Sequence, residues 1–440
     1  MLTNKITELS HGFSKLDRHQ RFARLLEIGV LTKEDVALLT SNCNFPINLA
    51  EKFIENALGY FPMPLGVATN FRIDQRDYII PMAVEETSII AAASKTAKWV
   101  RDHGEIVTEN LNVLNIGQIQ IARVNNFAHL TQIIAAEKTN LIADINQQVT
   151  HNLVKRGGGV TDLQLRKITR PDGDEMAVIH VLVDTCDAMG ANIINQVCEF
   201  LKNPIETLTG ERVTMAILSN LNDQKLTRAT ITLRDIDPQL GNDLAEASLF
   251  AALDPYRAAT NNKGVLNGMD AVLLATGNDW RAVEAGVHAY AVQNGQYRSI
   301  THWQMQNNEL IGTLEAPISV GIVGGVTQLH PVAKLGLQML GVSSANHLAR
   351  IIAAVGLVQN LGAIRALTTV GIIEGHMKLH IDNLTLGAGA QETEIPLLKK
   401  RLEEILLRTK RVSLTNAVEI LREIRNEQNE FTPFQPTIAS

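Results

Sequence analysis

The sequence predicts a mixed α/β (α+β) multidomain fold: a large α/β part, a smaller unit inserted into it, and a short helical part at the C-terminal end. Three observations lead to this prediction. Between about residues 113 and 218 the apolar periodicity follows the order β-α-β-β-α-β, the split β-α-β pattern of ferredoxin-like domains. Helical and strand periodicities are mixed on both sides of this stretch. Beyond about residue 390 the pattern is amphipathic and helical only.

The N-terminal third is predicted to be mainly helical, because apolar residues recur there three and four positions apart. In the Ala-rich stretch that ends this third, Glu85 and Glu86 are expected at the helix entrance, where the helix dipole favours negative charge. The predicted helices cover residues 16–31, 47–58 and 83–100, and residues 32–35 resemble a further helix start.

The inserted unit is delimited by strand-like alternation and by turn residues. Gly157-Gly-Gly159 ends its first helical stretch, and Pro171-Asp-Gly173 is expected to form a turn between two strands. The expected elements are a strand around 119–121, a helix over 127–141, strands over 162–168 and 176–184, a helix over 191–201 and a strand over 213–218.

The chain then returns to mixed structure, in which Ser343 or Ser344 is expected to cap a long Ala-rich helix. Residues 384–389 are small and are expected to be flexible; a mobile segment ahead of a small helical unit is typical of a lid or flap. The expected elements are a strand over 226–233, a glycine loop over 321–325, a helix to about 360 and another to about 370, and amphipathic helices over 395–407 and 414–424.

Composition excludes several classes of protein. The 440 residues are 45% hydrophobic and 20% charged, as in a globular protein with a large core. A net charge of −6 gives no basic surface for nucleic acid. Three scattered cysteines without a CxxC pair favour a reducing cytoplasm. The start lacks the apolar core of a signal peptide, and no apolar run is expected to span a bilayer, so we expect a soluble, cytoplasmic protein without a membrane partner.

The stretch from Asp254 to Ala282 is the best candidate for a catalytic segment. It places an arginine, a lysine, an asparagine and an aspartate among glycines and small residues. Small residues let a backbone approach a ligand, and the polar groups are suited to positioning and protonating a carbonyl. Turns are expected at Asn262-Lys-Gly264, at Asn267-Gly268 and at Gly277-Asn-Asp279.

Each candidate group also has a plain structural explanation. Asp279 is a suitable cap for a helix that begins at Trp280, and Lys263 is a suitable surface lysine. His376 and His380 stand four apart, but no third ligand accompanies them, so no metal is predicted. The chain has neither a GxSxG elbow nor a P-loop.

A dinucleotide site would need a substitute for the GxGxxG fingerprint, which is absent. The substitute that fits best is Asp184-Thr-Cys-Asp-Ala-Met-Gly-Ala-Asn192, at the junction of a predicted strand and helix. Backbone N–H groups at such a helix start suit a pyrophosphate. By composition alone the same residues are an ordinary strand-to-helix turn.

Taken together and in order, the motifs resemble those of class II 3-hydroxy-3-methylglutaryl-CoA (HMG-CoA) reductases, the soluble bacterial form, and the resemblance covers nearly the whole chain. One motif would carry little weight, but six in the family order are specific. They are Glu55-Asn-Ala-Leu-Gly59 with Pro64-Leu-Gly-Val-Ala68, Pro81-Met-Ala-Val-Glu-Glu86 with Ala91-Ala-Ala-Ser94, Asp187-Ala-Met-Gly-Ala-Asn192, the 254–279 segment, Val323-Gly-Gly325 and Gly375-His-Met377.

This resemblance implies a large substrate domain over residues 1–111 and 219–374, a small NAD(P)-binding domain over 112–218, and a C-terminal flap over 375–440. It also implies a homodimer or a higher homo-oligomer with active sites at the subunit interface. The site residues that carry over by motif position are Glu86, Lys263, Asp279 and His376 as catalytic groups, Arg257, Asn267, Ser88 and Glu55 as substrate-binding groups, and Asp187, Met189, Gly190 and Asn192 as cofactor-binding groups.

The implied chemistry suits these residue types. Reduction of a thioester to an alcohol takes two hydrides, and hence two nicotinamide cofactors used in turn. Lys263, held by Asp279, would stabilise the oxyanion, and Arg257 would pair with the free carboxylate of the substrate. His376 would protonate the departing CoA thiolate, and a protonated Glu86 would supply the proton of the new alcohol.

Two departures from the family pattern bear on the predictions. Thr87 replaces a frequent proline, which should loosen the local backbone without changing the chemistry. The stretch 147–152 lacks the acid that grips the adenosine ribose in some NADH-specific relatives, while Lys155 and Arg156 would tolerate a 2′-phosphate. NADPH, or use of both NADPH and NADH, is therefore favoured.

Two other functions stay open on the sequence. One is a non-catalytic CoA-binding regulatory protein of the same fold. The presence of a suitable residue at all four catalytic positions argues against it. The other is a dehydrogenase acting on a different acyl-CoA, in which Arg257 would lack its carboxylate partner.

Overall fold

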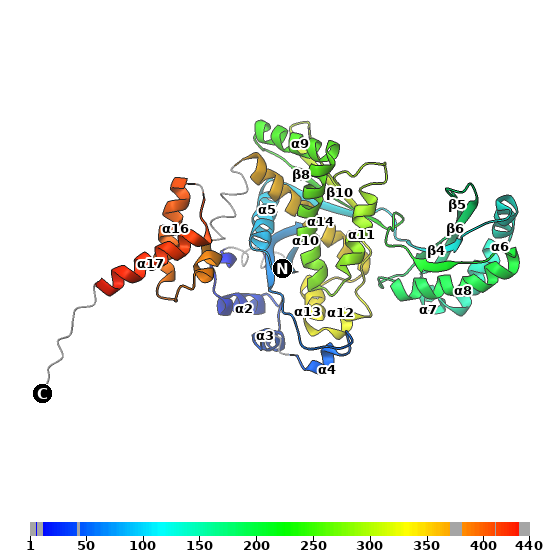
Figure 1. The fold of residues 1–440 in the computed structure, drawn as a ribbon, viewed down its shortest axis with the longest axis horizontal. Helices are drawn as coiled ribbons and strands as arrows, with labels where there is room; N and C mark the ends of the chain where they lie inside the picture. The colour runs from blue at the N-terminus through cyan, green and yellow to red at the C-terminus, as the bar shows by residue number, and fades with distance from the viewer. Residues whose placement is uncertain (1–5, 7–11, 42–44, 370–380, 410, 431–440) are drawn as a thin grey trace. The chain divides into compact units, whose positions relative to one another are not determined.

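The computed structural model describes residue 6 and residues 12–41, 45–369, 381–409 and 411–430. The chain divides into two compact units, of which the first comprises Met1–Val84 and Ile90–Gly362 and the second Glu85–Ile89 and Ala363–Ser440. The boundary predicted at residue 375 lies outside the described residues. The mixed α/β architecture predicted from the sequence is confirmed (Figure 1).

A six-stranded sheet forms the frame of the first unit, with the strand order β2-β1-β3-β8-β10-β9. Two of its hairpins turn on residue pairs with left-handed backbone, Asp74-Gln75 and Asn307-Asn308, as two-residue type I′ turns require. Its strands are β1 (Leu65–Ile73), β2 (Arg76–Ala83), β3 (Gly104–Asn110), β8 (Leu226–Leu233), β9 (Thr301–Gln306) and β10 (Glu309–Pro317).

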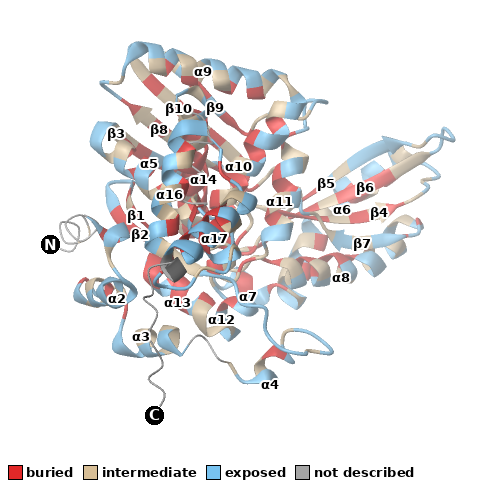
Figure 2. Ribbon diagram, turned by 60° about the vertical axis from the view of Figure 1, so that its left-hand side comes forward, coloured by how far each residue is buried: buried red, intermediate tan, exposed pale blue. Residues whose placement is uncertain are grey.

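Helices α10 (Pro255–Ala275) and α14 (Ala345–Thr368) form the buried centre of this part (Figure 2). They approach closely because Gly268 and Gly356 carry no side chain; a Cβ at Gly268 would lie 2.9 Å from Gln359 Cβ. The remaining helices are η1 (Phe13–Lys15), α2 (Arg18–Glu27), α3 (Lys33–Thr40), α4 (Ile47–Ala50), α5 (Ile89–His103), α9 (Pro238–Leu253), α11 (Trp280–Tyr290), α12 (Val326–Leu329) and α13 (Pro331–Leu340).

The inserted stretch has the predicted β-α-β-β-α-β order and folds around a core of its own. Its antiparallel sheet has the strand order β5-β6-β4-β7, and helices α6 and α8 pack on one face of it (Figure 1). The elements are β4 (Asn115–Ile121), α6 (Phe127–Gln148), α7 (His151–Val154), β5 (Gly159–Thr169), β6 (Glu175–Asp184), α8 (Ala191–Thr209) and β7 (Met215–Leu218).

The second unit is a small helical assembly. Residues 381–387 are helical, and they share a core with α16 (Ile395–Thr409) and α17 (Leu414–Glu430). The expectation of a flexible stretch over 384–389 is therefore wrong for its first half. Leu384 and Thr385 are buried there, and burial of an apolar face stabilises a helix that small residues alone would not predict.

Three helix boundaries also differ from the prediction. The helix expected over 47–58 stops at Ala50, and the two helices expected between 344 and 370 are the single helix α14, capped by Ser344 as anticipated. The helix expected from residue 83 begins only at Ile89, because β2 extends to Ala83 and pairs there with Leu65. Ladder pairing thus overrides local helix propensity.

Helix α14 bears on the expectation that no apolar run is able to span a bilayer. By length and composition it is apolar enough to cross a membrane, but 67% of its most apolar window is buried inside the protein. That burial is typical of the core helix of a globular protein.

Candidate active site

Helix α10 carries three of the predicted site residues, Arg257, Lys263 and Asn267. It begins at Asp254, whose side chain accepts a hydrogen bond of 3.1 Å from the Arg257 backbone N–H, and continues without interruption to Ala275. The turns predicted at Asn262-Lys-Gly264 and Asn267-Gly268 are therefore wrong. The tertiary structure uses these residues for packing instead, Gly268 against α14 and the buried Asn262 as a donor to Arg298 O.

The helical spacing places Lys263 and Asn267 on one face of α10, because residues four apart lie one above the other. Lys263 is exposed and Asn267 is half-buried on that face. Arg257 lies at the first turn of the helix and is also half-buried. Burial lowers the pKa of Arg257, but a guanidinium remains charged at neutral pH and keeps its capacity to bind a carboxylate.

Asp279 lies at the start of α11, the helix that follows α10. Gly277, with a φ of 66°, turns the chain, and the Asp279 carboxylate then accepts a 3.2 Å hydrogen bond from the Ala282 N–H. The structural explanation given for Asp279, a helix cap, is thus confirmed. A cap leaves carboxylate lone pairs for a further donor, so it is compatible with a second role.

The segment with Glu86 and Ser88 precedes α5 rather than opening it. Glu86 is exposed, and Ser88 has a φ of 79°, which is rare for a residue with a side chain. The Ser88 Oγ is buried and has no hydrogen-bond partner among the described residues. Both residues belong to the second compact unit, whereas Lys263 and Asp279 belong to the first.

His376, the fourth predicted catalytic residue, lies outside the described residues, as does His380. Glu55 is exposed and lies in the turns that follow α4. Over the part of the chain that the structure describes, no group of three His, Cys, Asp or Glu side chains is arranged to hold a metal ion.

The predicted cofactor turn connects β6, which ends at Asp184, with α8, which begins at Ala191. Gly190 precedes the helix with a φ of 100°, and a Cβ there would lie 2.4 Å from Thr185 Cγ2. The glycine therefore brings the backbone N–H groups at the start of α8 to the surface of a tight turn. Such a helix start binds phosphate groups through backbone N–H donors and the helix dipole.

Hydrogen bonds to Asp187 connect this turn to the part of the same unit that contains the six-stranded sheet. Its Oδ1 accepts a 2.9 Å hydrogen bond from Ala345 N at the start of α14, and its backbone carbonyl accepts one of 2.9 Å from Ile322 N. At least one oxygen of the Asp187 carboxylate is thus engaged in structure. Met189 and the exposed Asn192 complete the predicted cofactor set on the same turn and helix.

The triple glycine packs against the same turn. A Cβ at Gly158 would lie 2.6 Å from Asp184 O and 2.6 Å from Cys186 Sγ, so only glycine allows this approach. Lys155 and Arg156, just before it, are exposed. The two exposed cations therefore lie next to the triple glycine in the chain.

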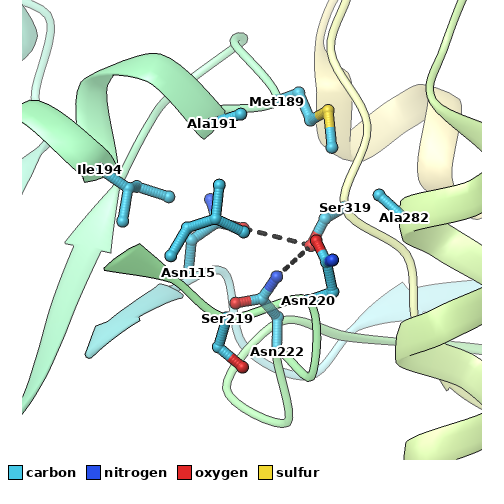
Figure 3. A pocket seen from close by; sticks show the side chains of 10 residues that line it. Asn115, Met189, Ala191, Ile194, Ser219, Asn220, Asn222, Ala282 and Ser319 are labelled. Atoms are coloured by element: carbon cyan, nitrogen blue, oxygen red, sulfur yellow. Dashed lines mark hydrogen bonds between the residues drawn. The ribbon is translucent and has the colours of Figure 1, made fainter. Parts of the chain in front are cut away.

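A small, partly open cavity lies between the cofactor turn and the start of α11 (Figure 3). Met189 and Ala191 line it from the turn, and Ala282 lines it from the helix that Asp279 caps. Ser319 Oγ joins two of its asparagines, donating to Asn115 Oδ1 at 3.1 Å and accepting from Asn222 Nδ2 at 3.0 Å. The full lining is Asn115, Met189, Ala191, Ile194, Leu218, Ser219, Asn220, Asn222, Ala282 and Ser319.

The sequence interpretation missed the polar residues of this cavity. Asn115, Asn220, Asn222 and Ser319 come from strand ends and loops far apart in the chain. The available signal was the run Ser219-Asn-Leu-Asn222 directly after a strand, because side chains that follow a strand gather at the sheet edge. Single amides in loops are otherwise too common to single out.

A buried cation near the turn was also missed. Lys225, at the entrance to β8, is only 4% exposed. Burial lowers the pKa of its ammonium to about 8, and the nearby carboxylates of Asp184 and Asp187 oppose that shift. Lys225 therefore places positive charge close to the turn that contains Asp184 and Asp187.

Comparison with known proteins identifies the family. The family model for hydroxymethylglutaryl-coenzyme A reductase matches residues 17–381. A 3-hydroxy-3-methylglutaryl-coenzyme A reductase from Archaeoglobus fulgidus is 42% identical over 420 residues, covering 94% of both chains. A probable 3-hydroxy-3-methylglutaryl-coenzyme A reductase from Borreliella burgdorferi is 31% identical and covers 96% of both.

Solved structures agree with these relatives. A 3-hydroxy-3-methylglutaryl-coenzyme A reductase from Streptococcus pneumoniae matches with a TM-score of 0.79 and 36% identity, over 94% of this chain and 99% of that one. A class II reductase from the same organism, bound to NADPH in open conformations, matches with a TM-score of 0.79 and 36% identity over 82% of this chain and 99% of that one. The chain therefore belongs to the hydroxymethylglutaryl-coenzyme A reductase family of oxidoreductases, as its motifs predicted.

Proposed function

We propose that the chain interconverts HMG-CoA and mevalonate plus CoA by two successive hydride transfers from NADPH or NADH. The observation that carries this proposal is the cavity that joins the cofactor turn to the helix capped by Asp279. The cavity lies next to the start of α8, whose backbone N–H groups suit a phosphate, and it is lined by Ala282 of the helix that begins at the predicted catalytic Asp279. The match to a reductase bound to NADPH supports the choice of cofactor.

The residues present fit a dinucleotide. Glycines at positions 158 and 190 let the backbone fold into a tight turn at the start of α8, and the buried Lys225 adds positive charge near Asp184 and Asp187. The nicotinamide would supply hydride when bound. Met189 and Asn192 of the predicted cofactor set would hold the cofactor, and the exposed Lys155 and Arg156 would favour NADPH over NADH.

The proposed catalytic roles follow the charge that develops on the substrate. The Lys263 ammonium would stabilise the thioester oxyanion, and Asp279 would orient that ammonium. His376 would donate a proton to the CoA thiolate, since a thiol pKa of about 8.5 lies within reach of a histidinium. Glu86 would protonate the final alcohol.

The substrate-binding roles are proposed from side-chain chemistry. Arg257 would form a paired contact with the free carboxylate, as a planar guanidinium does. Asn267, on the Lys263 face of α10, would position the tertiary alcohol or the carbonyl, with Ser88 and Glu55 completing the site. The buried and unpartnered Oγ of Ser88 is compatible with a ligand contact.

The test is nicotinamide oxidation by the purified protein with HMG-CoA, using NADPH and NADH in parallel. We expect two cofactors oxidised per HMG-CoA consumed, with a higher kcat/KM for NADPH. Succinyl-CoA and acetyl-CoA serve as controls and should give no turnover. Binding of HMG-CoA without oxidation of either cofactor would replace the proposal with the non-catalytic CoA-binding alternative, which no observation favours at present.

The domain roles are proposals on the same basis. We assign the substrate site to residues 1–111 and 219–374, the cofactor site to 112–218 and a flap to 375–440. The separate hydrophobic cores within the second and third ranges support the division. We also propose a cytoplasmic location, which the free thiols of Cys186 and Cys198 support.

We further propose a homodimer, with an apolar strip at the junction of α9 and α10 in its interface. The strip consists of Leu249, Phe250, Leu253 and Tyr256, all exposed in the isolated chain. Exposed apolar side chains that adjoin one another mark interaction surfaces. Arg257 follows the strip directly, so a second copy seated there would lie next to the substrate site.

Replacing Leu253 by glutamate should therefore shift the protein from dimer to monomer in light scattering coupled to size exclusion. A charge buried at an interface costs several kcal/mol, roughly a 100-fold or greater weakening of association. Leu407→Glu is the matched control, because Leu407 is 67% exposed and Leu253 is 66% exposed. An unchanged mass for the Leu253 variant would place the interface elsewhere.

A further inference from the structure

The side chain of Asn278 links the segment before Asp279 to a loop on the far side of the cavity. Asn278 is 9% exposed. Its Oδ1 accepts a 2.8 Å hydrogen bond from the Gly321 backbone N–H, and its Nδ2 donates at 3.1 Å to the buried Thr276 Oγ1. Donor and acceptor are thus both used, so the amide is held in one orientation.

The loop that Asn278 holds is itself fixed to the cofactor turn. A Cβ at Gly321 would lie 2.5 Å from Met189 N and 3.2 Å from Asp187 O, so the two backbones are in direct contact. The next residue, Ile322, donates its N–H to Asp187 O at 2.9 Å. Gly321 and Ile322 therefore form a two-residue strap between Asn278 and the cofactor turn.

Backbone hydrogen bonds on both sides of Asn278 couple its position to that of Asp279. Asn278 N–H donates to Leu273 O at 2.9 Å and Asn278 O accepts from Trp280 N at 3.1 Å, which fixes the backbone on both sides of the carboxylate. Gly277, just before Asn278, packs closely against α13, since a Cβ there would lie 2.8 Å from Ala333 Cβ. A shift of the strap would consequently move Asp279 with it.

We infer that Asn278 is a positioning residue that sets the distance between the catalytic Asp279 and the hydride donor held by the cofactor turn. This inference rests on the proposed function, because it takes Asp279 as catalytic and residues 184–192 as the cofactor site. Hydride transfer requires near contact between reacting atoms, and a misplacement of about 1 Å slows such steps on the order of 100-fold. The proposed substrate-binding residues Arg257 and Asn267 lie on α10, outside the strap.

The test compares Asn278→Ala with wild type and with Asn360→Ala. Asn360 is a matched control: it is 1% exposed, accepts from Trp303 Nε1 at 2.8 Å and donates to Asn261 Oδ1 at 2.8 Å. We expect Asn278→Ala to lower kcat by about 10- to 100-fold. The KM for HMG-CoA should change less than about twofold, because ground-state binding is retained.

Two readouts separate positioning from simple loss of folded protein. The primary isotope effect with NADPH deuterated at the transferred hydrogen should rise in Asn278→Ala, because hydride transfer becomes more rate-limiting. It should stay at the wild-type value in Asn360→Ala, even where stability falls equally. In a double-mutant cycle with Gly321→Ala, the double variant should be little slower than the slower single variant, because both changes break the same strap.

Failure of the proposed function and failure of this inference would give different experimental results. Wild-type protein that oxidises neither NADPH nor NADH with HMG-CoA removes the proposed function, and this inference with it. An active wild type, with Asn278→Ala at the wild-type kcat and isotope effect, overturns the inference alone. Lost activity with an unchanged isotope effect also overturns it, since Asn278 would then be structural only.

Discussion

Replacing Asp279 by asparagine should lower kcat by about 10²- to 10⁴-fold while leaving the thermal midpoint close to that of wild type. The structure explains why the two effects should separate. The Asp279 side chain caps α11 by accepting from Ala282 N, and asparagine caps helices about as well as aspartate. It lacks the negative charge that would orient the Lys263 ammonium beside the developing oxyanion.

The measurement is steady-state turnover with HMG-CoA and NADPH, together with thermal unfolding. Asp237→Asn is the matched control, because Asp237 caps α9 in the same way, accepting from Leu240 N at 2.9 Å, outside the proposed site. Lys263→Ala should lose activity to a similar extent. Retention of wild-type kcat in Asp279→Asn would show that Asp279 is a helix cap and nothing more.

The second large effect concerns a half-buried carboxyl pair, Asp270 on α10 and Glu284 on α11. Burial, followed by the charge of Glu284 and a hydrogen bond to it, raises the pKa of Asp270 to about 8. Its Oδ1 is buried and has no hydrogen-bond partner in the described structure. The sequence analysis gave no role to this pair, because its two members face each other only after α10 and α11 have packed.

Between pH 4 and about 8 the folded protein therefore keeps a proton on Asp270 that the unfolded chain has released. The stabilisation that this proton provides is fully present below the unfolded pKa of the group and is lost as the pH rises through about 8. Asp270→Asn removes the titration and leaves a neutral group of the same shape, which is able to donate to Glu284. We expect it to stabilise the fold by roughly 1–3 kcal/mol at pH 8, and by much less at pH 5.

Urea unfolding of wild type and Asp270→Asn across this pH range measures the effect directly. Glu284→Gln should flatten the same pH dependence, because it removes the neighbouring negative charge. If wild type and Asp270→Asn lose stability in parallel as the pH rises, the carboxyl pair does not hold the proton.

The predictions that succeeded rest on local signals. The order β-α-β-β-α-β of the inserted unit was readable because strand alternation and helical spacing leave different apolar patterns. The turn between Asp184 and Ala191 was marked by small residues at the junction of two such patterns. The cap role of Asp279 followed from an aspartate before the first helical position.

Several of the predictions that failed concern residues whose use depends on distant partners. Asn262 and Gly268 are turn residues by propensity, yet α10 runs through both because the asparagine bonds to Arg298 O and the glycine admits α14. In the same way Gly362 does not end α14, since a Cβ there would lie 2.5 Å from Thr96 Oγ1 on α5. Glycine signals a close approach as readily as a turn, and one sequence does not distinguish the two.

The sequence by itself determined the family, the α/β class, the inserted unit and the identity of the candidate catalytic side chains, because these depend on residue type and order along the chain. The tertiary structure decided which groups meet. It brought Asn115, Asn222 and Ser319 into one cavity and tied the Asp279 segment to the cofactor turn through Asn278 and Gly321. Contacts between residues far apart in the chain depend on packing free energy summed over the whole core. Local propensity therefore does not predict them.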